Sequence, residues 1–136
     1  MEIVKTVGIM FFKDKKLLVN KPRLRPTYQI VGGHIEKGES PIQAIIRECK
    51  EELGNKSLFD IDKIKYVMDF IEVNTAFPDK KIHMHLFIYE GILEGELSLS
   101  EEIEDFKWIS KDDDRSILSD ALRNEIIPYG IKNHYM

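Results

Sequence analysis

The chain has 136 residues, of which 43% are hydrophobic and 32% are charged, and its formal net charge is -4 at pH 7. This length suits a single domain with a hydrophobic core, spanning residues 1–136. The negative balance excludes a protein whose main task is to coat nucleic acid. No apolar run reaches the length of a membrane span, the N-terminus lacks a signal-peptide pattern, and the one cysteine, Cys49, has no partner for an intramolecular disulfide. We therefore expect a cytoplasmic protein with no membrane partner.

Segments rich in β-branched and aromatic residues predict strands along most of the chain. The first two are separated by a polar turn and predict a β-hairpin, and the fourth and fifth are separated by a turn around Pro78 and Asp79. The predicted strands are residues 5–12, 17–19, 28–31, 64–73, 81–89 and 106–109.

Residues 40–53 predict the clearest helix. Ser40 suits the N-cap, Pro41 suits the first helical position, and Gln43 completes a capping-box pattern. Gly54 suits the C-terminal stop. Apolar residues recur at helical spacing and predict the buried stripe, which consists of Ile42, Ile45, Ile46, Cys49 and Leu53.

A second amphipathic helix is predicted over residues 117–126, ending before Pro128. The order of elements predicts an α+β protein, an α/β/α sandwich in which a mixed β-sheet lies between helices.

The first helix carries Glu48, Glu51 and Glu52, and the loop before it carries Glu36 and Glu39. Glu48 and Glu52 are one turn apart, so their like charges repel and destabilise the isolated helix. A divalent cation would offset that repulsion, and an all-oxygen ligand set favours Mg²⁺ or Mn²⁺ over zinc. The alternative is that these glutamates form a solvated face, since glutamate is a good helix former and is usually exposed.

The spacing of residues 33–55 decides between these alternatives. The segment resembles the Nudix box, G-x5-E-x7-R-E-U-x-E-E-x-G-U, where U is aliphatic. Cys49 and Asn55 stand at the two U positions; we expect Cys49 to pack as a small hydrophobe and Asn55 to lower stability slightly. The fixed positions are all matched, by Gly33, Glu39, Arg47, Glu48, Glu51, Glu52 and Gly54.

The resemblance implies the Nudix fold and the hydrolysis of a pyrophosphate bond in a nucleoside diphosphate linked to another group. Water attacks phosphorus with the help of Mg²⁺, for which Mn²⁺ substitutes, and a carboxylate takes up a proton. Glu51 would be the general base, and the ion pair of Arg47 with Glu39 would orient the helix against its loop. The metal ligands implied by the match are the Gly32 carbonyl, Glu48, Glu51 and Glu52.

Nudix proteins often carry a further metal-binding or basic glutamate in a later loop. Residues 100–105 are acidic here, and Glu102 is the candidate, both as a metal ligand and as a rival general base; a solvated acidic loop is the alternative. Residues outside this loop are candidates for binding the substrate, through phosphates, the glycine loop or the wall of a nucleotide pocket. They are Lys21, Arg23, Arg25, Tyr28, Gly33 and His85.

Residues after the Nudix box narrow the choice of substrate class. ADP-ribose members tend to have a proline there and dinucleoside-polyphosphate members a tyrosine, and residues 71–74 contain neither. The resemblance therefore favours the mutator-type branch, acting on a small-molecule substrate such as a (deoxy)nucleoside triphosphate or an oxidised nucleotide. A non-catalytic nucleotide sensor and an RNA 5'-end pyrophosphohydrolase are the alternatives, and the net charge weighs against a stable nucleic-acid partner. The fold also allows a homodimer.

Overall fold

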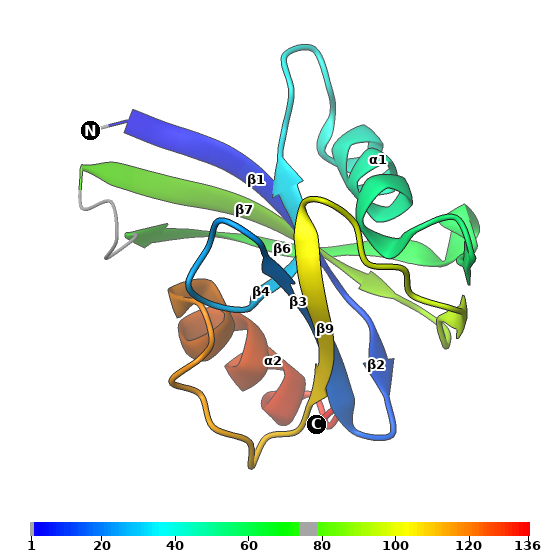
Figure 1. Ribbon diagram of the computed structural model, residues 1–136. Coiled ribbons are helices and arrows are strands. Elements are labelled where there is room, and N and C mark those ends of the chain that lie inside the picture. Colours follow the sequence, from blue (N-terminus) through cyan, green and yellow to red (C-terminus); the bar gives the residue numbers. More distant parts are fainter. Residues whose placement is uncertain (1, 74–78) are drawn as a thin grey trace.

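The computed structural model describes residues 2–73 and 79–136, so Pro78 of the predicted turn lies outside the described residues. The chain forms a strand-rich fold with one helix in its first half and one near its C-terminus (Figure 1). Its elements are β1 (Glu2–Met10), β2 (Phe12–Lys13), β3 (Lys16–Pro22), β4 (Gln29–His34), α1 (Pro41–Leu53), β5 (Ser57–Leu58), η1 (Ile61–Lys63), β6 (Ile64–Val73), β7 (Lys80–Tyr89), β8 (Glu94–Gly95), β9 (Ile103–Ile109), η2 (Leu122–Ile126) and α2 (Ile127–Lys132).

The large sheet is mixed, as predicted. Its strand order is β2-β3-β4-β1-β7-β6, and β9 pairs with β3 outside this path. β1 runs parallel to β7, whereas the other pairs are antiparallel. β5 and β8 form a separate two-stranded sheet.

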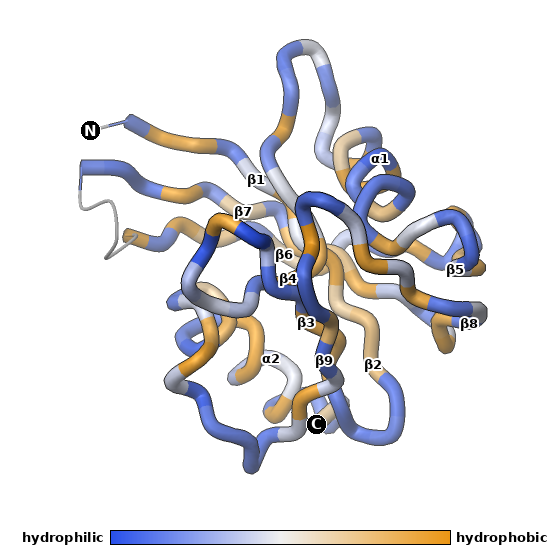
Figure 2. Tube along the Cα trace, in the orientation of Figure 1, coloured by the Kyte–Doolittle hydropathy of each residue, from blue (hydrophilic) through white to orange (hydrophobic). Residues whose placement is uncertain are grey.

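Two hydrophobic layers cover the two faces of the large sheet. One packs beneath α1 and includes Val7 and Ile9 of β1, and the other packs beneath α2 and includes Met10 and Leu17. Figure 2 shows hydrophobic residues along the central strands and hydrophilic ones in the turn after β2 and in the loop before α2. The sandwich of a mixed sheet between helices is confirmed.

The predicted hairpin is confirmed only at its tip. Phe12 pairs with Leu17, and the two-residue turn has positive φ angles at Asp14 (52°) and Lys15 (63°). Most of segment 5–12 lies instead in the middle of the sheet as β1, between β4 and β7. The physical reason is its unbroken apolar run, which is buried on both faces and therefore suits a central strand.

The first helix has the predicted ends. The Ser40 hydroxyl accepts a hydrogen bond from the Gln43 N–H at 3.3 Å, and the Gln43 side chain accepts one from the Ser40 N–H at 2.9 Å. Gly54 follows the last helical residue with φ of 86°, a conformation that costs glycine little. The predicted stripe is wrong at Ile42, which is 39% exposed, while Glu52 is buried in the inward face of the helix.

The second helix differs from its prediction at both ends. Leu118 forms a bridge with Tyr28 before the helix starts, and the helix continues past Pro128 to the end of α2. The Ile127 N–H bonds to the Leu122 carbonyl five residues back, which gives one wide turn immediately before the proline. Pro128 then lies in the first turn of α2, where its missing N–H is tolerated.

Candidate active site

Arg47 of α1 forms hydrogen bonds with carboxylates of the helix and of the loop before it. Its guanidinium binds Glu39 in a two-pronged pair, with Nε at 2.7 Å and Nη2 at 2.9 Å from the two carboxylate oxygens. Nη1 also donates to Glu48 at 2.8 Å and to Glu51 at 3.3 Å, and Nη2 donates to the His34 carbonyl at 3.0 Å. These hydrogen bonds from Arg47 hold the pKa of Glu39 at about 2. The loop is thereby fixed to the helix.

Glu52 lies between α1 and the sheet, with 6% of its surface exposed. Its carboxylate accepts a hydrogen bond from the Gly32 N–H at 2.9 Å, and the Asn20 amide lies 3.3 and 3.4 Å from its two oxygens. Burial raises the pKa of Glu52 to about 8, and the charge of Glu48 adds to that rise, while the two hydrogen bonds oppose it. Among the described residues, Glu52 is thus a buried acid whose carboxylate meets two hydrogen-bond donors, the Gly32 N–H and the Asn20 amide.

Asn20 is a functional candidate that the sequence pattern missed. Asn20 is buried, with 1% of its surface exposed, in a strand where three apolar residues precede it. A buried amide in such a strand needs a partner, and Glu52 supplies it. The only signal was a polar residue directly after Leu17–Val19, which does not distinguish a buried amide from the end of a strand.

The three glutamates of the helix lie at different depths. The side chain of Glu48 is 12% exposed and that of Glu51 is 52% exposed, so the solvated-face alternative describes Glu51 and not Glu48 or Glu52. Burial also raises the pKa of Glu48 against the opposing effect of Arg47. A Cβ atom on Gly33 would lie 2.5 Å from a Glu48 carboxylate oxygen, so a larger residue where β4 passes this side chain would displace the Glu48 carboxylate.

A cavity of about 920 Å³ opens beside these carboxylates. Glu102, from the loop between β8 and β9, lines it together with Glu48 and Glu52, and its charge contributes to raising the pKa of both. Thr6 lines it as well, and within residues 2–73 and 79–136 its hydroxyl is buried without a hydrogen-bond partner. Farther along the wall stand polar groups of β4 and of the start of the second helix, including Gln29, Ser119, Asp120 and Arg123.

Of the three cations predicted to contact phosphates, all within the described residues, only Arg25 lines this cavity. Lys21 forms an ion pair with Glu104 of β9. Arg23 lies 3.7 Å from the other oxygen of Glu104 and bonds to the main chain of residues 100–102. Lys21 and Arg23 therefore contact the acidic segment.

Tyr28 and His85 also lie away from the carboxylates. The Tyr28 hydroxyl bonds to Asp105, which raises the pKa of Tyr28 to about 12, and Lys107 Nζ lies 5.5 Å from its ring centre. His85 shares a sheet face with Phe87, on the α1 side, whereas Met84 faces the cavity from the other side. Its ring stands 4.6 Å from that of His83.

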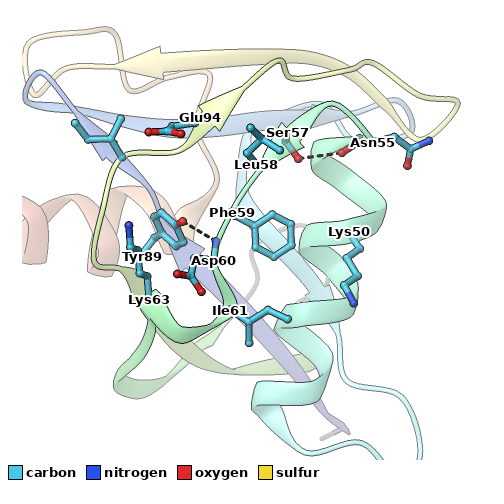
Figure 3. Close-up of a pocket in the computed structure, with 12 residues that line it drawn as sticks. Lys50, Asn55, Ser57, Leu58, Phe59, Asp60, Ile61, Lys63, Tyr89 and Glu94 are labelled. Atoms are coloured by element: carbon cyan, nitrogen blue, oxygen red, sulfur yellow. Dashed lines mark hydrogen bonds between the residues drawn. The ribbon is translucent and has the colours of Figure 1, made fainter.

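A smaller hollow of about 610 Å³ lies near the C-terminal end of α1 (Figure 3). Phe59 and Tyr89 line it, and the Tyr89 hydroxyl accepts a hydrogen bond from the Asp60 N–H at 2.7 Å. The described residues that line it include none of the glutamates that the box matches. The candidate site is therefore the larger cavity.

The donor set at the larger cavity fits a hard divalent cation. Glu48 and Glu52 place carboxylate oxygens in a poorly solvated position, where their charges disfavour each other and would favour a cation. Within the described part of the chain, no three His, Cys, Asp or Glu side chains form a ready-made cluster. Two carboxylates, with main-chain, water or substrate oxygens, suit magnesium, which commonly keeps several such ligands.

A mixed sheet between two helices, with a glutamate-bearing helix fixed by an arginine beside a large cavity, defines a protein of the Nudix class. The chain belongs to the Nudix family, because the family model described as "NUDIX domain" matches residues 3–126. The MutT protein from Methanosarcina mazei Go1 superposes with a TM-score of 0.75 at 19% identity, covering 97% of this chain and 96% of that one. This likeness supports the fold.

Two curated relatives are named for their activities. An RNA pyrophosphohydrolase from a Nitratiruptor species is 42% identical over 66 residues, which are 48% of this chain and 38% of the relative. The nucleoside triphosphatase NudI from Escherichia coli is 30% identical over 89 residues, 63% of each chain. The chain thus spans less than two thirds of either relative. Within its described residues, no helix has the length and apolar character needed to cross a membrane.

The buried Glu52 predicts how stability depends on pH in the metal-free protein. Its pKa of about 8 in the folded state exceeds its ordinary value of 4.5, so its stabilising contribution is complete below pH 4.5 and is lost as the pH rises through 8. The free energy of unfolding, measured by urea titration with a chelator present, should fall over this range more in the parent than in Glu52→Gln, by a few kcal/mol. Parallel pH profiles for the two proteins would contradict the prediction.

Proposed function

We propose that this chain is a Mg²⁺-dependent pyrophosphohydrolase that acts on a (deoxy)nucleoside triphosphate or an oxidised nucleotide. The observation that carries the proposal is a pair of carboxylates, the buried Glu52 and the partly buried Glu48, at the wall of a cavity of about 920 Å³. This volume lies in the range of small-molecule sites. NudI, named a nucleoside triphosphatase, supports the substrate class.

Glu48, Glu52 and the Gly32 carbonyl would hold the cation, with Mn²⁺ as a substitute, and Glu102 would add an oxygen from across the cavity. When bound, the cation supplies positive charge that offsets the charge of the phosphates. Arg47, through its pair with Glu39, keeps the helix and the loop before it in a fixed relative position during the reaction. Of the cations that the sequence predicted to contact phosphate, Arg25 lines the cavity and would do so, and Gly33 lines the same cavity.

Glu51 would be the general base, because its half-exposed side chain can release a proton to solvent. Its carboxylate contacts Arg47 at 3.3 Å and is not among the described groups that line the cavity. Glu102 is the rival, because it is also exposed and lines the same cavity as Glu48 and Glu52.

A second candidate substrate is the 5' end of RNA. It is favoured by the relative named RNA pyrophosphohydrolase, whose 42% identity exceeds that of NudI. The chemistry is the same, but the net charge of -4 does not favour a long polyanion. A non-catalytic nucleotide sensor of the same fold is the remaining alternative. A cytoplasmic location and a homodimer belong to the proposal as predictions.

The first test is a substrate panel with Mg²⁺. Nucleoside triphosphates, oxidised nucleotides, nucleoside diphosphate conjugates and a 5'-triphosphorylated RNA are compared by phosphate and pyrophosphate release. We expect the highest kcat/KM on a free nucleotide, complete loss on chelation and recovery with Mg²⁺ or Mn²⁺. A preference for the RNA would replace the main candidate with the second one, and no turnover of any compound would favour the sensor.

The second test compares two glutamates of the box region. Glu52→Gln keeps the size of the side chain and removes a charge from the proposed metal site, so turnover should fall about a hundredfold or more, equivalent to about 3 kcal/mol. Glu36→Gln changes a side chain that is 66% exposed and lies 3.7 Å from Arg47, and most activity should remain. Thermal melts of both variants separate a loss of chemistry from a loss of folding. Near-parental rates in both would refute the site assignment.

The third test concerns the buried hydroxyl of Thr6. If part of the substrate occupies the cavity and bonds to this hydroxyl, Thr6→Val should lower kcat/KM about fivefold, the value of one neutral hydrogen bond. The free variant should be as stable as the parent, because the hydroxyl has no partner among the described residues. Unchanged kinetics on every substrate of the panel would show that the hydroxyl is not a contact.

A further inference from the structure

Arg23 caps the main chain of the loop that carries Glu102. Its Nη2 donates to the Ser100 carbonyl at 3.3 Å, its Nε donates to the Glu101 carbonyl at 2.9 Å, and its own main-chain N–H donates to the Glu102 carbonyl at 2.7 Å. One residue thus satisfies the carbonyls of consecutive residues 100–102. Of the arginine and lysine side chains, the guanidinium alone offers donors in a fixed plane for such a contact, since a lysine ammonium is a compact point charge.

Hydrogen bonds within residues 100–103 shape this loop, and Arg23 attaches it to the end of β3. The Ser100 N–H bonds to the Ile103 carbonyl at 3.1 Å, and the Ser100 hydroxyl accepts from the N–H groups of Glu102 and Ile103. These bonds give the turn its shape. Its placement against the end of β3 comes from the Arg23 contacts and from the pairing of Ile103 with Pro22.

Glu102 needs such placement because its side chain is exposed and lies on a loop. It nevertheless lines the same cavity as Glu48 and Glu52, whose carboxylates come from a helix that is fixed by its own caps. An exposed glutamate loses conformational freedom when it is held in one place, so a rigid main chain beneath it lowers that cost. Arg23 does not belong to the described cavity lining, and its charge lies 3.7 Å from Glu104.

We propose that Arg23 is a positioning residue, which fixes the loop of residues 100–103 so that Glu102 faces the cavity that Glu48 and Glu52 line. This inference rests on the proposed function, since it takes Glu102 as part of the site. It gives Arg23 a different role from the phosphate contact that its sequence position indicates.

The experiment is a double-mutant cycle with a structural readout. Arg23→Ala, Arg23→Lys, Glu102→Gln and the double variant Arg23→Ala/Glu102→Gln are compared by kcat and KM on the best substrate of the panel, and by binding of Mn²⁺ alone. Hydrogen–deuterium exchange of residues 100–105 reports on the loop directly. Arg115→Ala is the matched control, because Arg115 also donates to a carbonyl, that of Lys111, in another loop.

We expect Arg23→Ala and Arg23→Lys to lower kcat about tenfold, to leave KM near its parental value and to speed exchange in residues 100–105 about tenfold. Both should weaken Mn²⁺ binding as Glu102→Gln does. In the Glu102→Gln background, Arg23→Ala should cause no further loss of kcat, because the residue it positions is already gone. Arg115→Ala should leave exchange in this segment unchanged.

Three results would overturn the inference. The first is full activity of Arg23→Lys, which would show that charge alone matters. The second is an undiminished effect of Arg23→Ala in the Glu102→Gln background, which would show that Arg23 contacts the substrate directly. The third is parental activity and Mn²⁺ binding in Glu102→Gln, which would show that Glu102 is not part of the site. Failure of the proposed function is recognised separately, by the absence of turnover on every compound of the panel or by parental turnover in Glu52→Gln.

Discussion

The placement of the Glu52 carboxylate between α1 and the sheet is the constraint on which the site depends. Glu52 is buried in the helix face that also buries Cys49 and Leu53, and its oxygens meet the Gly32 N–H and the Asn20 amide. A buried carboxylate without an opposite charge destabilises a fold. The same low solvation strengthens its attraction for a cation. The residue that lowers the stability of the metal-free protein is therefore the one best placed to bind metal.

Local patterns were sufficient to predict the parts of the fold that local interactions determine. The caps of α1 at Ser40 and Gly54 depend on neighbouring residues, and the ranges of β6 and β7 follow from runs of strand-forming residues. The central position of β1 depends on pairing with β7, which is distant in the sequence and brings Ile9 beside Phe87. The continuation of the second helix past Pro128 depends on one wide turn, for which the sequence contains no recognised signal.

In the candidate site too, some contacts could be expected from the sequence, whereas others depend on tertiary pairing. The pair of Arg47 with Glu39 was expected from the resemblance, and the contact of Arg47 with Glu51 follows from the i,i+4 spacing of the helix. Asn20 reaches Glu52 only because β3 pairs with β4, the strand against which the helix packs, and Lys21 meets Glu104 only because β3 pairs with β9. A cation that precedes the glycine loop in sequence therefore does not have to face the phosphates, and tertiary pairing decides its partner.

The three glutamates of α1 differ in depth, and depth separates what each can do. Glu48 and Glu52 are too little solvated to exchange protons freely with bulk water, and their shared charge favours a cation beside them. Glu51, whose side chain is 52% exposed, has the access to solvent that a base needs in order to be regenerated after each turnover. Residues with the same side chain, within a single turn of helix, thus meet different solvent and different partners. The division of roles that we propose follows from those surroundings, which composition alone does not reveal.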